Sequence, residues 1–238
     1  VTSRVERRPY GAVLILAPGN YPLMLSGIQL LQALIAGNVV ALKPAPGGEA
    51  TARLLIDLLL RAGFPPAVCV VLPTDSGAEA VAAGFDLIVL TGSAQTGRRV
   101  LQDAARTLTP TIMELSGVDP VFVLPGADLK HVARRLVYGA RLNNGETCIA
   151  PHRVFIRHED KTALVTLLRS MLVQKPSLSC DNAGQARLAA LMEQIEASGG
   201  HAETIEGVTL FTEVEGLHDR LDTDIFMPWL AVTGVSDM

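Results

Sequence analysis

The sequence lacks the features that mark several classes of protein. It has three cysteines among 238 residues, and Cys69, Cys148 and Cys180 lie far apart without forming a paired framework. Unpaired cysteines are typical of a reducing compartment, so we expect a cytoplasmic protein. Basic residues are not in excess, because the net charge is −4. We therefore expect neither nucleic acid nor an anionic membrane surface as the main partner.

Disorder, repeats and metal-ligand spacing are also missing. Charged residues make up 18 % of the chain and hydrophobic residues 49 %, a composition that favours a packed core over disorder. The length allows one large domain or two modest ones. The five histidines show no metal-ligand spacing, so we expect no bound metal.

Charge is absent between Arg8 and Lys43, a length that is also typical of a membrane span. Prolines, glycines and asparagines interrupt the stretch, and a lipid-facing helix would leave the backbone groups that they free without partners. Two buried strands around a buried helix explain the same composition, so we expect no membrane span. The chain begins at Val1 without a secretory signal pattern, and we interpret Val1 as a fragment boundary.

Short β-branched runs alternate with helix-like stretches up to Leu115. Strands are predicted at 11–16, 39–42, 68–72, 87–90 and 111–115, and helices at 23–35, 50–61, 78–83 and 96–106. Strands without alternating polarity, separated by helices, indicate a parallel sheet covered on both faces. We predict an α/β fold with a doubly wound parallel sheet over residues 1–115.

The alternation of predicted strands and helices is less regular beyond residue 115. Strands are predicted at 121–124 and 154–157, helices at 129–142, 162–173 and 183–197, and a surface loop at 176–182. We predict that residues 116–238 form a second α/β domain.

Polar residues and glycines follow the predicted strands, where open parallel sheets bind ligands. They are Asn20, Lys43, Gly92-Ser93, Gly97 and Glu114. The stretch from Gly92 to Gly97 lacks the G-x-G-x-x-G spacing. The backbone N–H groups of this segment could bind a phosphate. The alternative is an ordinary strand-to-helix turn in which a serine caps the helix, and the residues alone favour this alternative. Lys43 could likewise bind a phosphate or a ribose hydroxyl, but considered alone it is predicted to be a solvated surface lysine.

Cys148 lies in a polar, Gly-containing loop, Asn143–Pro151, between a predicted helix and strand. A lone cysteine is usually a small buried hydrophobic residue, whereas this loop favours an exposed thiol in a crevice. Cys69 is expected in the core, Cys180 is expected to be an incidental loop thiol, and His152 is expected to pack locally.

Together and in this order, these segments resemble the aldehyde dehydrogenase superfamily. The matching segments are 9–13, 20–23, Ala36–Pro44, Thr91–Gly97, Met113–Gly117, the loop through Gly145 and Cys148, and Ile225-Phe226 before Pro228. The resemblance runs from about Pro9 to Val232. It implies a nucleotide-binding domain over residues 1–115 and a shortened catalytic domain over residues 116–238.

The resemblance also implies the roles of individual residues. Cys148 would be the nucleophile, Asn20 with the backbone N–H of Cys148 the oxyanion hole, and Glu114, partly buried, the base that activates water. The residues implied to bind NAD or NADP are Lys43, Gly92, Ser93, Gly97, Asp224 and Phe226. The substrate would be a small aldehyde, oxidised to an acid through a thiohemiacetal and a thioester.

The chain also departs from the family pattern. Pro46 replaces the glutamate that grips the ribose, which permits NADP, and Asp224 replaces a longer glutamate. Gly19 stands where the family usually has a tryptophan, and Met227 stands where it has a glycine. The chain is shorter than the family at both ends, which would expose apolar surface and favour a homo-oligomer. Two alternatives stay open: a non-catalytic homologue that binds nucleotide or only folds, and a CoA-acylating or semialdehyde dehydrogenase.

Overall fold

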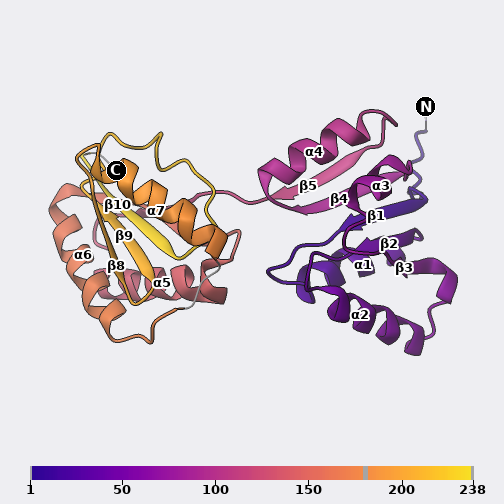
Figure 1. The fold of residues 1–238 in the computed structure, drawn as a ribbon, viewed down its shortest axis with the longest axis horizontal. Coiled ribbons are helices and arrows are strands. Elements are labelled where there is room, and N and C mark those ends of the chain that lie inside the picture. The colour runs from indigo at the N-terminus through magenta and orange to yellow at the C-terminus, as the bar shows by residue number, and fades with distance from the viewer. Residues whose placement is uncertain (1, 179–181, 237–238) are drawn as a thin grey trace. The chain divides into compact units, whose positions relative to one another are not determined.

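The computed structural model describes residues 2–178 and 182–236, so Cys180 lies outside the described residues. The chain divides into two compact units, Val1–Leu115 and Ser116–Met238, and each contains a five-stranded sheet (Figure 1). No helix in the described ranges has the length and apolar character needed to cross a membrane.

The sheet of the first unit is entirely parallel, in the order β3-β2-β1-β4-β5. Its strands are β1 (Ala12–Leu16), β2 (Val39–Lys43), β3 (Cys69–Val71), β4 (Leu87–Gly92) and β5 (Thr111–Leu115). The central strands are almost continuously apolar because both of their faces are covered, so neither face needs polar residues.

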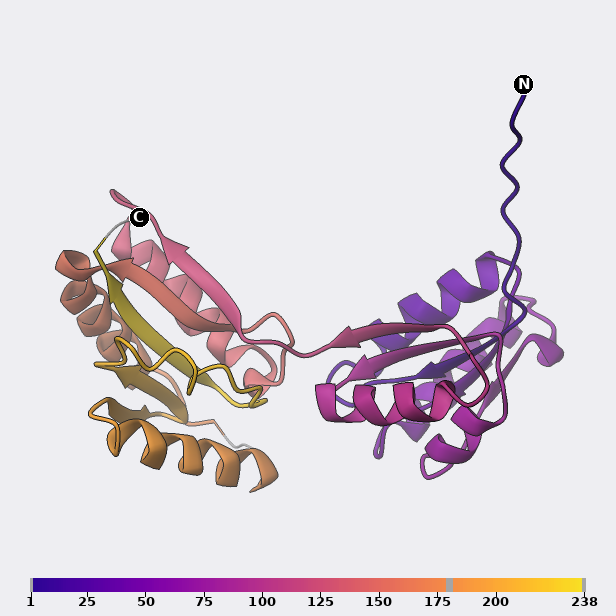
Figure 2. The ribbon, with the colours of Figure 1, turned by 90° about the horizontal axis from the view of Figure 1, so that it is seen from above.

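Helices cover both faces of this sheet, as Figure 2 shows. The helices α1 (Met24–Ile35) and α2 (Glu49–Arg61) pack on the face that includes Val13 and Ile15. The opposite face, which includes Leu14 and Leu16, is covered by α3 (Gly77–Ala82) and α4 (Ala94–Ala104). A short 3-10 turn, η1 (Pro66–Val68), precedes β3. The predicted doubly wound α/β fold is confirmed.

The second unit has the strand order β6-β7-β10-β9-β8, parallel except for the β8–β9 pair. Its strands are β6 (Asp119–Val123), β7 (Pro151–Arg157), β8 (His201–Ile205), β9 (Val208–Thr212) and β10 (Trp229–Val235). One face packs against α5 (Leu129–Arg141) and α6 (His158–Val173), and α7 (Asn182–Glu196) covers the other. The 3-10 segment η2 (Leu142–Gly145) follows α5.

Three strands of the second unit were not predicted. The pair β8–β9 is a hairpin whose two loop residues, Glu206 and Gly207, both have positive φ, 46° and 80°. A two-residue turn of this kind matches the twist of paired strands, but Glu is an unusual first residue for it. The central strand β10 begins with Trp229 and is buried over six of its seven residues. Its continuous apolar run is the same signal that predicted β1.

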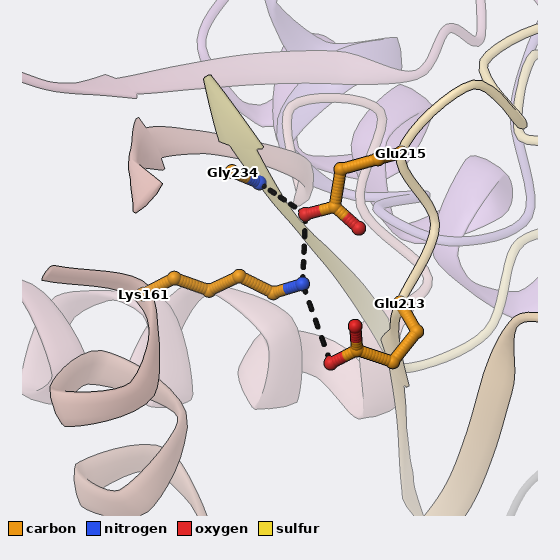
Figure 3. Close-up of polar contacts among 4 residues, drawn as sticks. All are labelled: Lys161, Glu213, Glu215 and Gly234. Carbon is orange, nitrogen blue, oxygen red and sulfur yellow. Dashed lines mark hydrogen bonds and ion pairs between the residues drawn. The ribbon is translucent and has the colours of Figure 1, made fainter. Parts of the chain in front are cut away.

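An ion cluster around a buried lysine joins α6 to the chain that follows β9. The Lys161 side chain is 11 % exposed, and its Nζ donates to Glu215 at 2.7 Å and to Glu213 at 3.5 Å (Figure 3). The same Glu215 oxygen accepts the N–H of Gly234 in β10 at 2.7 Å. Although burial raises the pKa of Glu215, the contacts with Lys161 and Gly234 outweigh it and hold the pKa below the usual value. The cluster therefore stabilises the charged carboxylate.

Candidate functional site

The sequence-predicted residues of the first unit lie toward the carboxyl ends of its parallel strands. Lys43 ends β2, Gly92 ends β4, and Glu114 lies in β5 beside Thr91. Asn20 follows β1 by four residues. Because all five strands run in the same direction, these residues lie toward one edge of the sheet.

The turn after β4 is shorter than predicted. Gly92 belongs to the strand and pairs with Leu115, so the turn consists of Ser93 alone. Ser93 caps α4, and its Oγ accepts the N–H of Thr96 at 3.2 Å. The capping interpretation of this segment is therefore correct. The remaining N–H groups of the first helical turn are the type of donor that binds phosphate.

Gly97 lies where α4 packs closely against β5. A Cβ atom on this glycine would lie 3.0 Å from Cδ2 of Leu115. In dinucleotide folds, a glycine at the start of the helix can serve this same purpose, allowing the helix to lie close to the sheet. The site residue thus has a packing reason that the sequence alone did not reveal.

Asn20 is half-buried in the segment between β1 and α1. Its side-chain oxygen accepts the N–H of Tyr21 at 3.0 Å. This bond fixes Oδ1 as an acceptor for the backbone of the next residue.

Lys43 is half-buried and lies against the start of α3. A Cβ atom on Gly77 would be 3.9 Å from its Nζ. Burial lowers the pKa of Lys43, and the negative charges of Asp75 and Glu49 oppose that shift. Two carboxylates from other positions therefore act on the ammonium, whereas Pro46 contributes none.

Glu114 is exposed on β5, which corrects the expectation that it is partly buried. Its neighbour in the ladder is Thr91, whose Oγ1 accepts a hydrogen bond from Gln29 Nε2 at 2.7 Å. Residue 29 comes from α1, so this bond ties the helix to the carboxyl end of β4.

In the second unit, Cys148 lies at the corner of a turn. The N–H of Ala150 donates to the carbonyl oxygen of Thr147 at 3.0 Å, which closes the turn around Cys148 and Ile149. Thr147 is buried, and its hydroxyl donates to the carbonyl oxygen of Leu142 at 3.2 Å. Ala150 is also buried, whereas Cys148 between them is half-buried. The thiol is therefore held between two fixed anchors.

The approach to this turn packs against the segment before β10. Asn143, Asn144 and Gly145 all have positive φ, and a Cβ atom on Gly145 would lie 2.4 Å from the backbone nitrogen of Pro228. Only glycine allows two backbones to approach so closely. The glycine of the Cys148 loop thus brings it against the segment that carries Asp224 and Phe226.

Asp224 and Phe226 are both half-buried in this segment. Asp224 accepts a hydrogen bond from the hydroxyl of Ser116, at the start of the second unit. No pattern in the sequence indicated this contact, because the two residues lie 108 positions apart.

His152 packs locally, as expected, but in a specific way. The pairing of β6 with β7 matches Asp119 to Pro151 and Pro120 to Arg153, so His152 is the extra residue of a bulge. Its ring stacks on Trp229, with centroids 4.3 Å apart and planes 14° apart, and Nδ1 lies 3.1 Å from the Trp229 carbonyl oxygen.

Burial lowers the pKa of His152, against the opposing effects of the Trp229 carbonyl and of Asp224 and Asp119. The neutral ring is therefore favoured. Since a carbonyl oxygen only accepts, Nδ1 carries the proton.

A cavity of about 1010 Å³ opens between α5 and the end of α6. Its lining includes Arg134, Arg135, Arg141 and Lys175, and Arg141 already donates to two backbone carbonyls. Cys148 is not among the described residues that line it. Its volume alone does not make it the candidate site, because none of the sequence-predicted site residues is among the described residues that line it.

Comparisons with known proteins place this chain in one family. The model of the aldehyde dehydrogenase family matches residues 1–238. The chain is 34 % identical to a 4,4'-diapolycopene-4,4'-dial dehydrogenase from Cytobacillus firmus, over 98 % of this chain and 55 % of the relative. It is 32 % identical to human aldehyde dehydrogenase family 3 member B1, over 98 % of this chain and 53 % of that protein.

Solved structures show the same fold. Betaine aldehyde dehydrogenase from Staphylococcus aureus, in complex with NAD⁺, superposes with a TM-score of 0.89 at 20 % identity, over 96 % of this chain and 51 % of that one. A Pseudomonas syringae aldehyde dehydrogenase C mutant, in complex with NAD⁺ and octanal, gives 0.89 at 25 % identity, over 98 % of this chain and 54 % of that one. The chain spans about half the length of the relatives it matches. It belongs to the aldehyde dehydrogenase family.

Proposed function

We propose that the chain carries the nucleotide-binding and nucleophile-bearing parts of an enzyme that oxidises an aldehyde to a carboxylic acid. Residues 1–115 would bind NAD(P), and residues 116–238 would supply the nucleophile. The observation that carries the proposal is the half-buried Cys148 at the corner of an anchored turn. A thiol held at a fixed, partly accessible position is suited to nucleophilic attack, whereas a structural cysteine is normally enclosed.

The thiolate of Cys148 attacks the carbonyl carbon, and the π electrons move to the carbonyl oxygen. The Asn20 side-chain amide and the backbone N–H of Cys148 donate hydrogen bonds to that oxygen. Removing one such donor typically costs about 3 kcal/mol in the barrier. Collapse of this adduct with loss of hydride leaves a thioester on the Cys148 sulfur.

Glu114 removes a proton from water, which attacks the thioester carbon. The Cys148 thiolate leaves, and the carboxylic acid is released. The exposed position of Glu114 on β5 leaves its carboxylate accessible to water. This step favours hydrolysis over transfer of the acyl group to CoA, because a general base is what water requires.

The residues at the carboxyl edge of the first sheet fit a dinucleotide. Lys43 would hold the adenosine ribose, Gly92 and Ser93 with the first turn of α4 would hold the phosphates, and Gly97 would bring that helix close to the sheet. Asp224 and Phe226 keep the cofactor-binding roles that the resemblance implies. When bound, the nicotinamide accepts the hydride.

The ribose environment favours NAD over NADP. Carboxylates near a ribose accept hydrogen bonds from the 2′-hydroxyl and repel a 2′-phosphate. The charges of Glu49 and Asp75 both act on Lys43, so they would act on a phosphate placed beside it. We infer that Glu49 and Asp75 together repel a 2′-phosphate, which the uncharged Pro46 cannot do.

The test is turnover of the purified chain with NAD and a panel of aldehydes that includes octanal, which the Pseudomonas syringae structure contains. Hydrolysis of an activated ester measures the thiol without cofactor. Cys148→Ala should lower both activities by at least about a thousandfold. The thiol control Cys180→Ala should retain them.

Glu114→Gln should accumulate the thioester, which mass spectrometry detects as an acylated Cys148 peptide. Cofactor binding without turnover in the unaltered chain would refute the catalytic proposal and support the nucleotide-binding alternative. Faster product formation on adding CoA would support the acylating alternative.

A further inference from the structure

His152 occupies an unusual place beside the candidate nucleophile. It lies four residues after Cys148, at the start of β7. The bulge at the start of β7 inserts His152 between two residues that pair regularly with β6. Bulges change the direction in which a side chain points and are frequent next to active sites. This one places an imidazole on Trp229.

The stack connects the two segments on which the second unit's site residues lie. On one side, His152 continues directly from the turn that carries Cys148. On the other, Trp229 Nε1 donates to the carbonyl oxygen of Ile225 at 3.2 Å, and Ile225 lies between Asp224 and Phe226. The close approach of Gly145 to Pro228 joins the same two segments from the other end of the loop. The Cys148 turn is thus fixed at both ends against one segment.

We propose that His152 is a positioning residue for the Cys148 thiol, and that the neutral ring holds the turn closed while protonation releases it. This rests on the proposed role of Cys148. The ring is 3 % exposed, and its Nδ1–H donates to Trp229, so a second proton on Nε2 would be buried in a largely apolar place. Two carboxylates, Asp224 on the same segment as Trp229 and Asp119 on β6, face the ring and reduce this cost. Burial outweighs them, so the neutral ring persists below pH 6.5.

The alternative is that the stack only contributes to the core of the second unit. A purely structural contact would affect stability everywhere in that unit, whereas a positioning contact affects the Cys148 thiol in particular. The measurements must therefore read out the ring and the thiol separately.

Trp229 gives the direct readout, because it is the single tryptophan of the chain. A protonated imidazole stacked on an indole changes its fluorescence. Titration of tryptophan fluorescence should show a step with a midpoint below pH 6.5, the ordinary value of histidine. His152→Phe, which keeps the stack but cannot be protonated, should remove the step. His201→Phe, a change at an exposed histidine on β8, should leave it.

Alkylation by iodoacetamide, followed for each cysteine peptide by mass spectrometry, reads out the thiol. Loss of an aromatic contact should release the turn, so His152→Ala should raise the Cys148 rate by about fivefold. Hydrogen exchange of the β9 amides, in the core of the second unit, is the structural control and should not change, because a positioning contact does not alter the stability of that core. His152→Phe should restore the Cys148 rate.

A rise in β9 amide exchange that matches the rise in the Cys148 rate, or an unchanged Cys148 rate in His152→Ala, would overturn the proposal. A fluorescence step that persists in His152→Phe would also overturn it. Neither readout needs hydride transfer, so failure here is distinguishable from failure of the dehydrogenase proposal.

Discussion

The two units hold their candidate residues by different means. In the first unit, Lys43, Gly92 and Glu114 belong to strands, and the parallel ladder brings them toward one edge. In the second, Cys148 is on a loop, and its position depends on anchors at Thr147 and Gly145 and on the packed His152. Ladder geometry tolerates changes of side chain, whereas a loop held by close packing does not. Four predictions test how firmly each unit holds its residues, in order of decreasing expected effect.

Gly145→Ala should have the largest effect on stability. The new methyl group would meet backbone atoms of Pro228 and Met227 that cannot rotate away, and φ is +77°. We expect a loss of about 3 kcal/mol in the free energy of unfolding, measured by urea denaturation. Gly126→Ala is the matched control, because its φ is +80° and nothing lies within 4 Å. It should cost only about 1 kcal/mol, from backbone strain. Equal losses would contradict the packing argument.

Lys161→Met should come next, with a loss of about 2 kcal/mol at neutral pH, because it leaves Glu215 partly buried without its cation. The folded-state pKa of Glu215 is lowered from 4.5, so the stability it contributes is full above pH 4.5 and is lost as the pH falls through the lower folded value. Glu215→Gln should therefore flatten the acid limb of a stability–pH curve. A limb as steep as that of the unaltered chain would refute this contribution.

Glu49→Gln and Asp75→Asn should change cofactor preference and leave the fold intact. Removing either charge lowers the repulsion of a 2′-phosphate, so NADP should bind about fivefold more tightly, measured by isothermal titration calorimetry. Binding of NAD should weaken or stay the same. Glu79→Gln, at an exposed position in α3, controls for the loss of one negative charge. If it shifts the preference equally, net charge and not position is responsible.

Gly97→Ala should have the smallest effect, although it is the same substitution as in Gly145→Ala. The new Cβ would lie 3.0 Å from Leu115, whose side chain is 40 % exposed and has room to move. Alanine also favours the helix by about 1 kcal/mol, so we expect a net change near zero in thermal unfolding. A loss as large as that of Gly145→Ala would show that the first unit is packed as rigidly as the second.

Much of the first unit could be predicted from the pattern of residues. The strand at 111–115 was placed with the bounds that the structure has, and the helices differed by one or two residues at their ends. In the second unit β8, β9 and β10 were missed, because an unusual Glu-Gly turn and a long irregular segment separate them. The effect of Asp75 and Glu49 on Lys43 could not be predicted either, since Asp75 is distant from Lys43 in sequence.

Composition and the order of apolar runs were enough to determine an α/β chain with a parallel first sheet, because strands buried on both faces must be apolar throughout. The spacing of glycine, cysteine and acidic residues was enough to indicate the family. Only the tertiary structure decided which residues hold Cys148 in place. Contacts such as those of Gly145 with Pro228 and of His152 with Trp229 join residues more than seventy positions apart, and no local pattern encodes such pairs.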